Sequence, residues 1–277
     1  MAPLDYHRPP LKWAGGKFAL LGRILPKLPP GQRLIEPFLG SCVVALNAGP
    51  RRLYLSDYNE RLINFYRVVR DLPSELLEES APLFQACNNR EAFEALRAEF
   101  NARLAPGSVR DAALFLYLNR HGFNGLYRVN SKGVFNVPFG RYARTLHPRE
   151  ALERLSARLA DAELGSRDFE LSLAEAGPGD VVYCDPAYVP LSATSYFASY
   201  TDRSFGLADQ ERLAFFAERA AERGATVVIS NHDTPVTRRL YGAAQIESFA
   251  VRRSISSDTL NRGHAAELLA VYAPRGA

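Results

Sequence analysis

The sequence has few of the residues that build covalent or metal-based scaffolds. Its three cysteines, Cys42, Cys87 and Cys184, are odd in number, widely spaced and outside any Cys-x-x-Cys or Cys/His pattern. This spacing argues against a disulfide framework and against a zinc site. We therefore expect a protein without a metal, which works in the reducing environment of the cytoplasm.

Long apolar runs and targeting segments are also missing. No stretch is apolar for long enough to cross a bilayer, and residues 1–17 lack the apolar core of a signal peptide. Neither a full G-x-G-x-x-G motif nor a Walker A motif occurs, so binding of a dinucleotide or of ATP through those motifs has little support. We expect an intracellular protein with no membrane partner.

One long stretch, residues 119–144, has no acidic residue. The net charge of the whole chain is only +4, which permits a polyanionic partner without requiring one. The stretch reads NRHGFNGLYRVNSKGVFNVPFGRYAR and mixes basic residues with aromatic ones. A solvated polar loop is the ordinary alternative, but a basic surface with interleaved aromatic residues is typical of a nucleic-acid interface.

The apolar pattern divides the chain into an α/β part and a helical part. Residues 33–40 and 52–57 are predicted to form strands followed by helices, and residues 72–118 are helical throughout. After a further helix at 149–162, the α/β pattern resumes with strands at 166–172, 179–185 and 225–231, a helix at 207–224, and two last strands at 245–251 and 266–273 that suggest an antiparallel edge.

We therefore expect one doubly wound, Rossmann-like α/β domain interrupted by a helical, basic module. The first consists of residues 1–60 and 148–277, and the second of residues 61–147. In a parallel sheet, ligands bind at the carboxyl ends of the strands, where Glu36 and Asp57 would lie.

Three features near the N-terminus indicate a nucleoside-bearing cofactor. KWAGGK (12–17) supplies lysines, an indole and paired glycines, and EPFLGS (36–41) places a carboxylate and a glycine turn between a strand and a helix. Asp57 follows Glu36 at roughly the twenty-residue spacing of a ribose-binding acid. The ordinary alternative is a set of simple turns, with Trp13 in the core and Asp57 as a helix N-cap just before Asn59.

The sharpest motif is Asp185-Pro186-Ala187-Tyr188, at the end of the expected strand 179–185. Asp185 can accept hydrogen bonds, proline stiffens the chain, and Tyr188 offers a flat face. This set suits an amine on an aromatic ring, which is a poor nucleophile because its lone pair is delocalised into the ring. A carboxylate and a backbone carbonyl that accept its two hydrogens would favour the tetrahedral form of the nitrogen, which can act as a nucleophile. The ordinary alternative is that Asp185 caps the next segment and Tyr188 is half-buried at a domain seam.

Seven sequence blocks together resemble the DNA adenine-N6 methyltransferase (Dam) family, in that family's α-type motif order, from about residue 11 to 272. The resemblance implies a SAM-dependent methyltransferase fold with an inserted DNA-recognition domain. It also implies transfer of a methyl group from S-adenosylmethionine (SAM) to N6 of a flipped adenine in double-stranded DNA, typically in GATC. The blocks are LKWAGGK, IEPFLGS, LSDYN, LFLYLNRHGFNGLYRVNSKGVFNVPFGRY, VVYCDPAYVPLSAT, VVISNHDT and VRRSISS.

The resemblance implies roles for the residues that match these blocks. Catalytic residues that hold the target base would be Asp185, Pro186 and Tyr188. Contacts with the methyl donor would come from Trp13, Lys17, Glu36, Phe38, Gly40, Asp57, Asp168, Phe169 and Asp185. Contacts with DNA would come from Lys12, Arg120, Phe123, Asn124, Leu126, Arg128, Asn136, Pro138, Arg141 and Arg252.

The resemblance implies different contacts for the individual DNA-binding residues. Arg128 would read a guanine edge, Leu126 and Pro138 would touch a thymine methyl group, and Phe123 with Asn124 would fill the gap left by the flipped adenine. Lys12, Asn136 and Arg141 would hold the backbone or a flanking base. Residues 231–233 and 252–256 would lie at strand ends near the DNA, although Arg252 and Arg253 fit a solvated surface equally well.

One residue departs from the family pattern. The catalytic box of the family is normally Asp-Pro-Pro-Tyr, and its third position here is Ala187. Alanine frees φ and restores an N–H, so we predict a folded protein whose catalysis is weakened but not abolished.

Two alternative functions follow. One is a catalytically silent protein that binds SAM and DNA, and the other is a cytosine-N4 methyltransferase, against which Asp rather than Ser at position 185 argues. We expect a monomer with no obligate protein partner, in the cytoplasm at a bacterial nucleoid or in a phage-infected cell.

Overall fold

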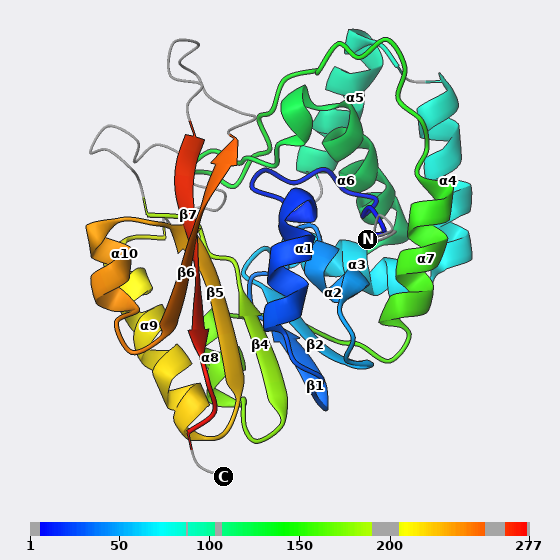
Figure 1. Ribbon diagram of the computed structural model, residues 1–277. Coiled ribbons are helices and arrows are strands. Elements are labelled where there is room, and N and C mark those ends of the chain that lie inside the picture. The colour runs from blue at the N-terminus through cyan, green and yellow to red at the C-terminus, as the bar shows by residue number, and fades with distance from the viewer. Residues whose placement is uncertain (1–5, 87, 103–106, 190–204, 253–263, 276–277) are drawn as a thin grey trace.

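A computed structural model describes residues 6–86, 88–102, 107–189, 205–252 and 264–275 (Figure 1). Its centre is one seven-stranded sheet with the strand order β3-β2-β1-β4-β5-β7-β6. Strands β1 to β5 are parallel, and β7 is antiparallel to both β5 and β6. The strands are β1 (Arg33–Glu36), β2 (Arg52–Asp57), β3 (Glu163–Ser166), β4 (Asp180–Cys184), β5 (Thr226–His232), β6 (Gln245–Arg252) and β7 (His264–Tyr272).

This order confirms the expected doubly wound sheet with an antiparallel edge. The chain moves outward from β1 through β2 to β3, and outward in the other direction from β4 through β5, so β1 and β4 meet at the switch point of the topology. Ligands of such sheets bind beside the carboxyl ends of the strands at that point. The segments that follow β1 and β4 are Glu36–Ser41 and Asp185–Tyr188.

The parallel strands are apolar along their whole length because both of their faces are buried. Neighbouring residues alternate between two hydrophobic clusters, as a strand with a two-residue period requires. Leu34 and Val181 belong to one cluster, and Ile35 and Val182 belong to the other. The first cluster contains helices α2, α3 and α7, and the second contains α8 and α9.

The helices cover both faces of the sheet and form a separate stack above one end of it. They are α1 (Leu21–Ile24), α2 (Val43–Asn47), α3 (Glu60–Asp71), α4 (Pro73–Ala86), α5 (Arg90–Ala102), α6 (Val109–His121), α7 (Arg149–Leu159), α8 (Phe169–Ala174), α9 (Leu207–Glu222) and α10 (Pro235–Leu240). Short 3-10 turns occur at Phe18–Leu20, Leu25–Lys27 and Phe123–Gly125. No helix in the described part of the chain is long and apolar enough to span a membrane.

The predicted strand at residues 166–172 is wrong. The edge strand β3 lies earlier, and α8 begins at Phe169. Asp168 causes this change, because its side chain accepts a hydrogen bond from the backbone N–H of Glu170 and caps the helix. The other predicted strands form close to the expected positions.

The helical part is α4, α5 and α6 together with the basic loop that follows. Helix α6 is buried on nearly all sides, and α4 and α5 pack against it. Helix α3 contacts β2 and β3 at the sheet and α6 in the helical part, so one core cluster runs through both. The division at residues 61 and 147 therefore stays a prediction.

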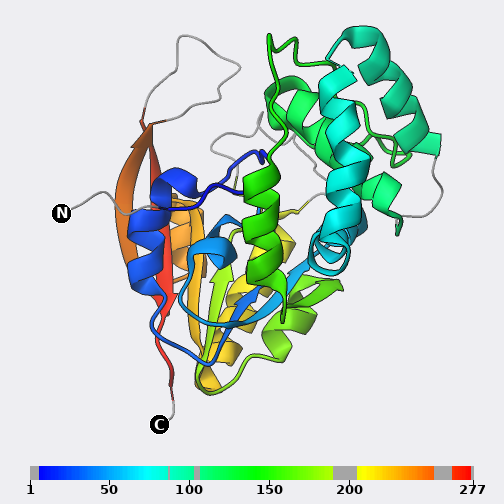
Figure 2. The same cartoon turned by 90° about the vertical axis from the view of Figure 1, so that its right-hand side faces the viewer.

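The helical part stands at the end of the sheet where the parallel strands finish. In Figure 1, β7 runs down toward the C-terminus, so the parallel strands run upward and end near the green loop and helices. The turned view in Figure 2 shows the same helices, cyan to green, above the same end of the sheet. The basic loop and the carboxyl ends of the parallel strands thus lie on the same side of the molecule.

Candidate active site

Asp185 lies directly after β4 and is held by two residues distant in the sequence. Its Oδ1 atom is 2.9 Å from Lys17 Nζ and accepts a hydrogen bond of 2.8 Å from the Ser230 hydroxyl. Ser230 lies in β5, is almost fully buried, and its hydroxyl is also 3.1 Å from the hydroxyl of Tyr183. Both contacts go to Oδ1, and Oδ2 accepts no hydrogen bond from the described residues.

Tyr188 forms the aromatic wall of the same corner. Lys17 Nζ lies 4.6 Å from its ring centroid, and the ring of His232 meets it edge-on at 4.8 Å. The Tyr188 hydroxyl donates to Glu267 Oε2 at 3.2 Å. Desolvation, followed by the charge of Asp185, raises the pKa of Tyr188 well above its usual value, so the phenol stays neutral.

The turn after β1 is built on Asp57 and a glycine. Asp57 accepts hydrogen bonds from the backbone N–H of Gly40 and of Asn59, each at 3.0 Å. Gly40 has φ +46°, and a Cβ there would lie 3.0 Å from the Trp13 ring, so a side chain at this position is disfavoured on two grounds. Burial raises the pKa of Asp57 against the opposing effect of these N–H donors.

The alternative that Asp57 caps α3 is wrong. Asn59 occupies the N-cap, and its side chain accepts from the backbone N–H of Leu62. Asp57 is therefore available at the carboxyl end of β2, where an acid for ribose hydroxyls was expected.

Glu36 has a different setting from the other predicted donor-binding residues. It is buried, and its Oε2 atom accepts from the N–H of Ala45 in α2 at 3.2 Å. Desolvation raises the pKa of Glu36 well above its usual value. The side chain therefore supports α2 from beneath the turn.

An aromatic group lies beside the turn. The Phe38 ring stacks on the Phe169 ring at 5.3 Å and meets the Phe205 ring edge-on at 5.6 Å. Asp168, which caps α8, pairs with Arg212 at 3.0 Å. Phe38 and Phe169 were predicted as donor-binding residues, and the structure brings them into contact.

These residues fit a nucleoside-bearing methyl donor. The set combines flat apolar rings, a backbone turn without a Cβ at Gly40, and the carboxylates of Asp57 and Asp168 at the carboxyl ends of adjacent strands. Rings can stack on a purine, and carboxylates can accept from ribose hydroxyls. The roles of these residues in binding the methyl donor are part of the proposal below.

The N-terminal segment is fastened to the helical part through Lys12. The Asn119 side chain accepts from the Lys12 N–H at 2.8 Å and donates to the Lys12 carbonyl at 2.7 Å. Gly125 has φ +62°, and a Cβ there would lie 2.3 Å from Lys12 Cβ. Lys12 Nζ lies over the Tyr142 ring at 4.1 Å. Burial lowers the pKa of both Lys12 and Arg120.

The basic loop alternates buried anchors with exposed side chains. Tyr127, Phe135 and Val137 are buried in the core that contains α6. Between them, Arg128 is exposed and Asn136 is half-buried, and Arg128 Nε donates to Asn136 Oδ1 at 2.7 Å. The anchors therefore hold the intervening residues at the surface.

The remaining predicted DNA-binding residues lie on or near this surface. Phe123 is 50% exposed, and its N–H donates to the carbonyl of Pro138 at 2.9 Å, which ties the two ends of the loop together. Arg252 ends β6, but its side chain and all of Arg253 lie outside the described residues. Asn124, Pro138 and Arg141 are exposed, and Leu126 is half-buried.

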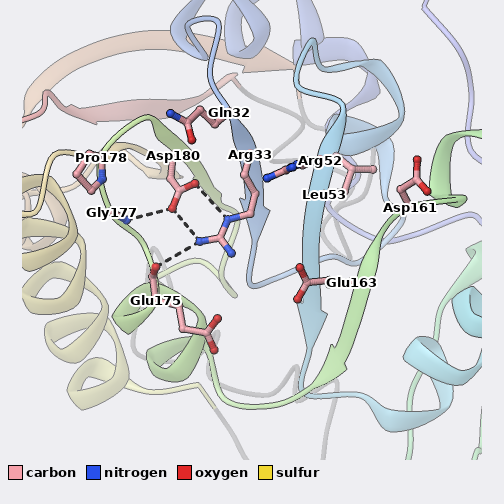
Figure 3. A pocket seen from close by; sticks show the side chains of 10 residues that line it. All are labelled: Gln32, Arg33, Arg52, Leu53, Asp161, Glu163, Glu175, Gly177, Pro178 and Asp180. Carbon is pink, nitrogen blue, oxygen red and sulfur yellow. Dashed lines mark hydrogen bonds and ion pairs between the residues drawn. The ribbon is translucent and has the colours of Figure 1, made fainter.

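A separate pocket lies at the opposite end of the sheet, by the amino ends of the strands (Figure 3). Arg33 reaches across it from β1 to Asp180 on β4, with its NH2 atom 2.8 Å from Oδ2. Glu163 and Glu175 also line it. None of the predicted site residues lies here.

Sequence reasoning missed Ser230, Gln210 and Tyr241, and it misplaced Asn231. Asn231 was expected near the DNA but is fully buried, with its side chain bonded to Gln210 and Tyr241. The signal for Ser230 and Asn231 was two polar residues at the end of an apolar strand. Gln210 had no such signal, because a single glutamine on an amphipathic helix is ordinary.

Comparison of the sequence with known proteins identifies its relatives. A DNA adenine methylase of Salmonella typhi is 45% identical over 265 residues, covering 95% of each chain. Those of Escherichia coli (strain K12), 44% identical over 265 residues, and of Vibrio cholerae serotype O1 (strain ATCC 39541 / Classical Ogawa 395 / O395), 42% identical over 266 residues, also cover 95% of each chain.

The rRNA methyltransferase aviRa from Streptomyces viridochromogenes aligns over 92% of this chain and 82% of its own, with 16% identity and a TM-score of 0.34, a likeness too weak to support an argument. Residues 13–255 match the family described as "D12 class N6 adenine-specific DNA methyltransferase". The match spans most of the chain, and the relatives cover nearly all of it. This chain therefore belongs to the D12 class N6 adenine-specific DNA methyltransferases, enzymes that methylate adenine in DNA.

Proposed function

We propose that this enzyme transfers the methyl group of S-adenosylmethionine to N6 of an adenine in GATC, after that adenine has flipped out of double-stranded DNA. The observation that carries the proposal is the corner formed by Asp185 and Tyr188. A carboxylate and an aromatic face meet there at the switch point of the sheet, on the side of the basic loop.

The corner already holds a nitrogen donor against an aromatic ring. The Lys17 ammonium lies 2.9 Å from Asp185 Oδ1 and 4.6 Å from the Tyr188 ring centroid. A flipped adenine presents the same combination, an N–H donor attached to a flat ring. Asp185 Oδ2 is available for the amino group, because Lys17 and Ser230 both engage Oδ1.

A second acceptor comes from the main chain. The carbonyl of Ala187 accepts from the Gln210 side chain at 2.7 Å, whereas no described residue donates to the carbonyl of Pro186. We assign the Pro186 carbonyl as the partner for the second amino hydrogen. Two acceptors would draw the nitrogen lone pair out of conjugation with the ring and direct it toward the methyl group.

The methyl donor would lie beside the turn after β1. Asp57 would accept from its ribose, Gly40 would let the backbone approach, and Phe38 and Phe169 would enclose its purine. When bound, S-adenosylmethionine supplies an electrophilic methyl group on a sulfonium. The remaining task of the chain is to hold the amine in line with that group and to exclude water.

The basic loop supports recognition of DNA. Arg128 is exposed and oriented by Asn136, and arginine's fork pairs with O6 and N7 of guanine. Phe123 is exposed and would fill the space left by the flipped base. The catalytic corner, the donor site and the loop all belong to one chain, which supports action as a monomer. The few, widely spaced cysteines are consistent with action in the reducing cytoplasm.

Methyl transfer from labelled S-adenosylmethionine to a GATC duplex tests the proposal. Label should appear on adenine N6, and a duplex in which GATC is replaced should take up little. Label on cytosine would indicate a cytosine-N4 enzyme. A shift of the duplex in a gel without any label would indicate a silent binding protein.

A further inference from the structure

Gln210 in α9 contacts the loop that carries the catalytic box. Its Nε2 atom donates to the carbonyl oxygen of Ala187 at 2.7 Å. Gln210 is only 2% exposed, and α9 packs on the face of the sheet that α8 also covers. A buried amide that reaches an exposed loop through a short hydrogen bond is a specific restraint, because leaving either group unpaired costs free energy.

The orientation of this amide is fixed by unambiguous donors. Asn231 Oδ1 accepts from the backbone N–H of Val189 at 3.1 Å and of His232 at 2.9 Å, so Asn231 Nδ2 must point the other way. It donates to Gln210 Oε1 at 3.0 Å. The Tyr241 hydroxyl donates to the same oxygen at 3.0 Å. Gln210 Nε2 is thereby directed at Ala187.

The network holds the backbone on both sides of Tyr188. Gln210 binds the peptide group before Tyr188 through the Ala187 carbonyl, and Asn231 binds the peptide group after it through the Val189 N–H. His232 Nδ1 donates to the Val189 carbonyl at 2.8 Å, which restrains the next peptide group as well. Gln210, Asn231 and Tyr241 are almost completely buried, so their positions are set by the core.

We propose that Gln210 is a positioning residue for methyl transfer, which aims the Pro186 carbonyl and the Tyr188 ring by holding the Ala187 peptide from outside the loop. This inference rests on the proposed function, since it concerns the grip on the target amine. Gln210, Asn231 and Tyr241 thus form one hydrogen-bond network that positions the catalytic loop. Gln210 itself touches neither substrate.

Ala187 explains why such a restraint matters in this chain. Alanine imposes no ring on its own backbone, so its φ is free where a proline would fix it near −65°. The conformation of the loop therefore depends on hydrogen bonds from neighbouring elements. The hydrogen bond from the Gln210 side chain in α9 therefore restrains the backbone at Ala187, where a proline ring would otherwise fix φ.

Gln210→Leu tests the role, because leucine is similar in size and makes no hydrogen bond. We expect kcat to fall roughly 10- to 100-fold, since small misplacement of reacting groups is costly. The KM values for DNA and for S-adenosylmethionine should stay within about threefold, because neither substrate touches Gln210. Tyr54→Phe is the matched control: it deletes a part-buried hydrogen bond to Glu175 of 2.8 Å and another from Arg167, far from the catalytic corner, and kcat should not change.

A double-mutant cycle separates positioning from loss of stability. The fall in kcat caused by Gln210→Leu should be at least about threefold smaller with proline at position 187 than with alanine, although proline adds no contact with α9. Equal effects of Gln210→Leu with alanine and with proline at position 187 would overturn the proposal. So would a fall in thermal stability without any fall in kcat.

If Gln210→Leu does not fold, Tyr241→Phe tests the same proposal. It removes one donor to Gln210 Oε1, and kcat should fall about two- to tenfold, the range for one hydrogen bond. Unchanged kcat in folded Tyr241→Phe would overturn the inference. Failure of the unaltered enzyme to label adenine would instead contradict the proposed function, so the two failures are distinguishable.

Discussion

Arg128 Nε donates to Asn136 Oδ1 over 2.7 Å, which joins two residues of the basic loop that lie eight positions apart. Arg128 NH2 also donates to the Asn136 carbonyl at 3.3 Å. Arg128 is exposed, yet these bonds fix the plane of its guanidinium before DNA arrives. Because less side-chain entropy is lost on binding, such an arginine is suited to reading a base edge.

Arg128→Ala should relax specificity at one base pair. Loss of a bidentate guanine contact should reduce the preference for GATC over a duplex altered at that guanine by about 10- to 100-fold. The measurement is the ratio of kcat/KM on the two duplexes. Lys132→Ala, an exposed residue of the same loop, is the control and should weaken binding to both duplexes alike.

Asp57→Asn should weaken binding of the methyl donor. Replacing an ionised acceptor near the ribose with a neutral amide should raise the Kd for S-adenosylmethionine about tenfold, while the Kd for DNA stays constant. Calorimetric titration measures both. Asp161→Asn is the control, because Asp161 lines the pocket at the opposite end of the sheet (Figure 3). An unchanged Kd in Asp57→Asn would remove Asp57 from the donor site.

His121 should make the fold sensitive to acid. Its Nδ1 donates to the Tyr117 carbonyl, its Nε2 is buried without a partner among the described residues, and burial lowers its pKa to about 4. His121 is therefore protonated below about pH 6.5 in the unfolded chain, but only below about pH 4 in the folded chain. The free energy of unfolding should fall through this window, by up to ~3 kcal/mol.

Urea unfolding at several pH values between these limits checks the prediction. His121→Phe, which keeps a ring stacked on Tyr117, should show a weaker loss of stability with acid than the unaltered chain. The difference between the two curves isolates His121 from the carboxyl groups. Parallel curves would mean that His121 does not contribute.

Ala187→Pro should raise turnover in the enzyme that keeps Gln210. Ala187 N–H donates no hydrogen bond to a described residue, so proline deletes no contact there, and a fixed φ should raise kcat about two- to fivefold. Steady-state methylation of a GATC duplex measures the effect, with both substrates at saturation. No rise in kcat would show that alanine at this position does not weaken catalysis.

The parallel strands and the motifs at their ends were predictable because local sequence determines them. Strands buried on both faces are continuous apolar runs, and the switch point brings the segments after β1 and β4 together. Residues 166–172 were predicted as a strand because their apolar residues fit either period. A single capping interaction, from Asp168 to the N–H of Glu170, decides the helix, and its effect is not visible in the apolar pattern.

The support around the catalytic box was not predictable. Gln210 lies 23 positions from Ala187, and its role depends on where α9 packs against β5 on one face of the sheet. Ser230 reaches Asp185 only because β5 pairs with β4 in a particular register. Such contacts are set by tertiary packing, and a single sequence marks them only as polar residues among apolar ones.

Asp185→Asn tests the central claim most directly, through the rate of methyl transfer to adenine measured with GATC duplex and S-adenosylmethionine at saturation. An amide can still bond to Ser230, but it loses the charge that pairs with Lys17 and grips the amino group. The rate should fall at least about 100-fold while the duplex still binds. A rate equal to that of the unaltered enzyme would contradict the account.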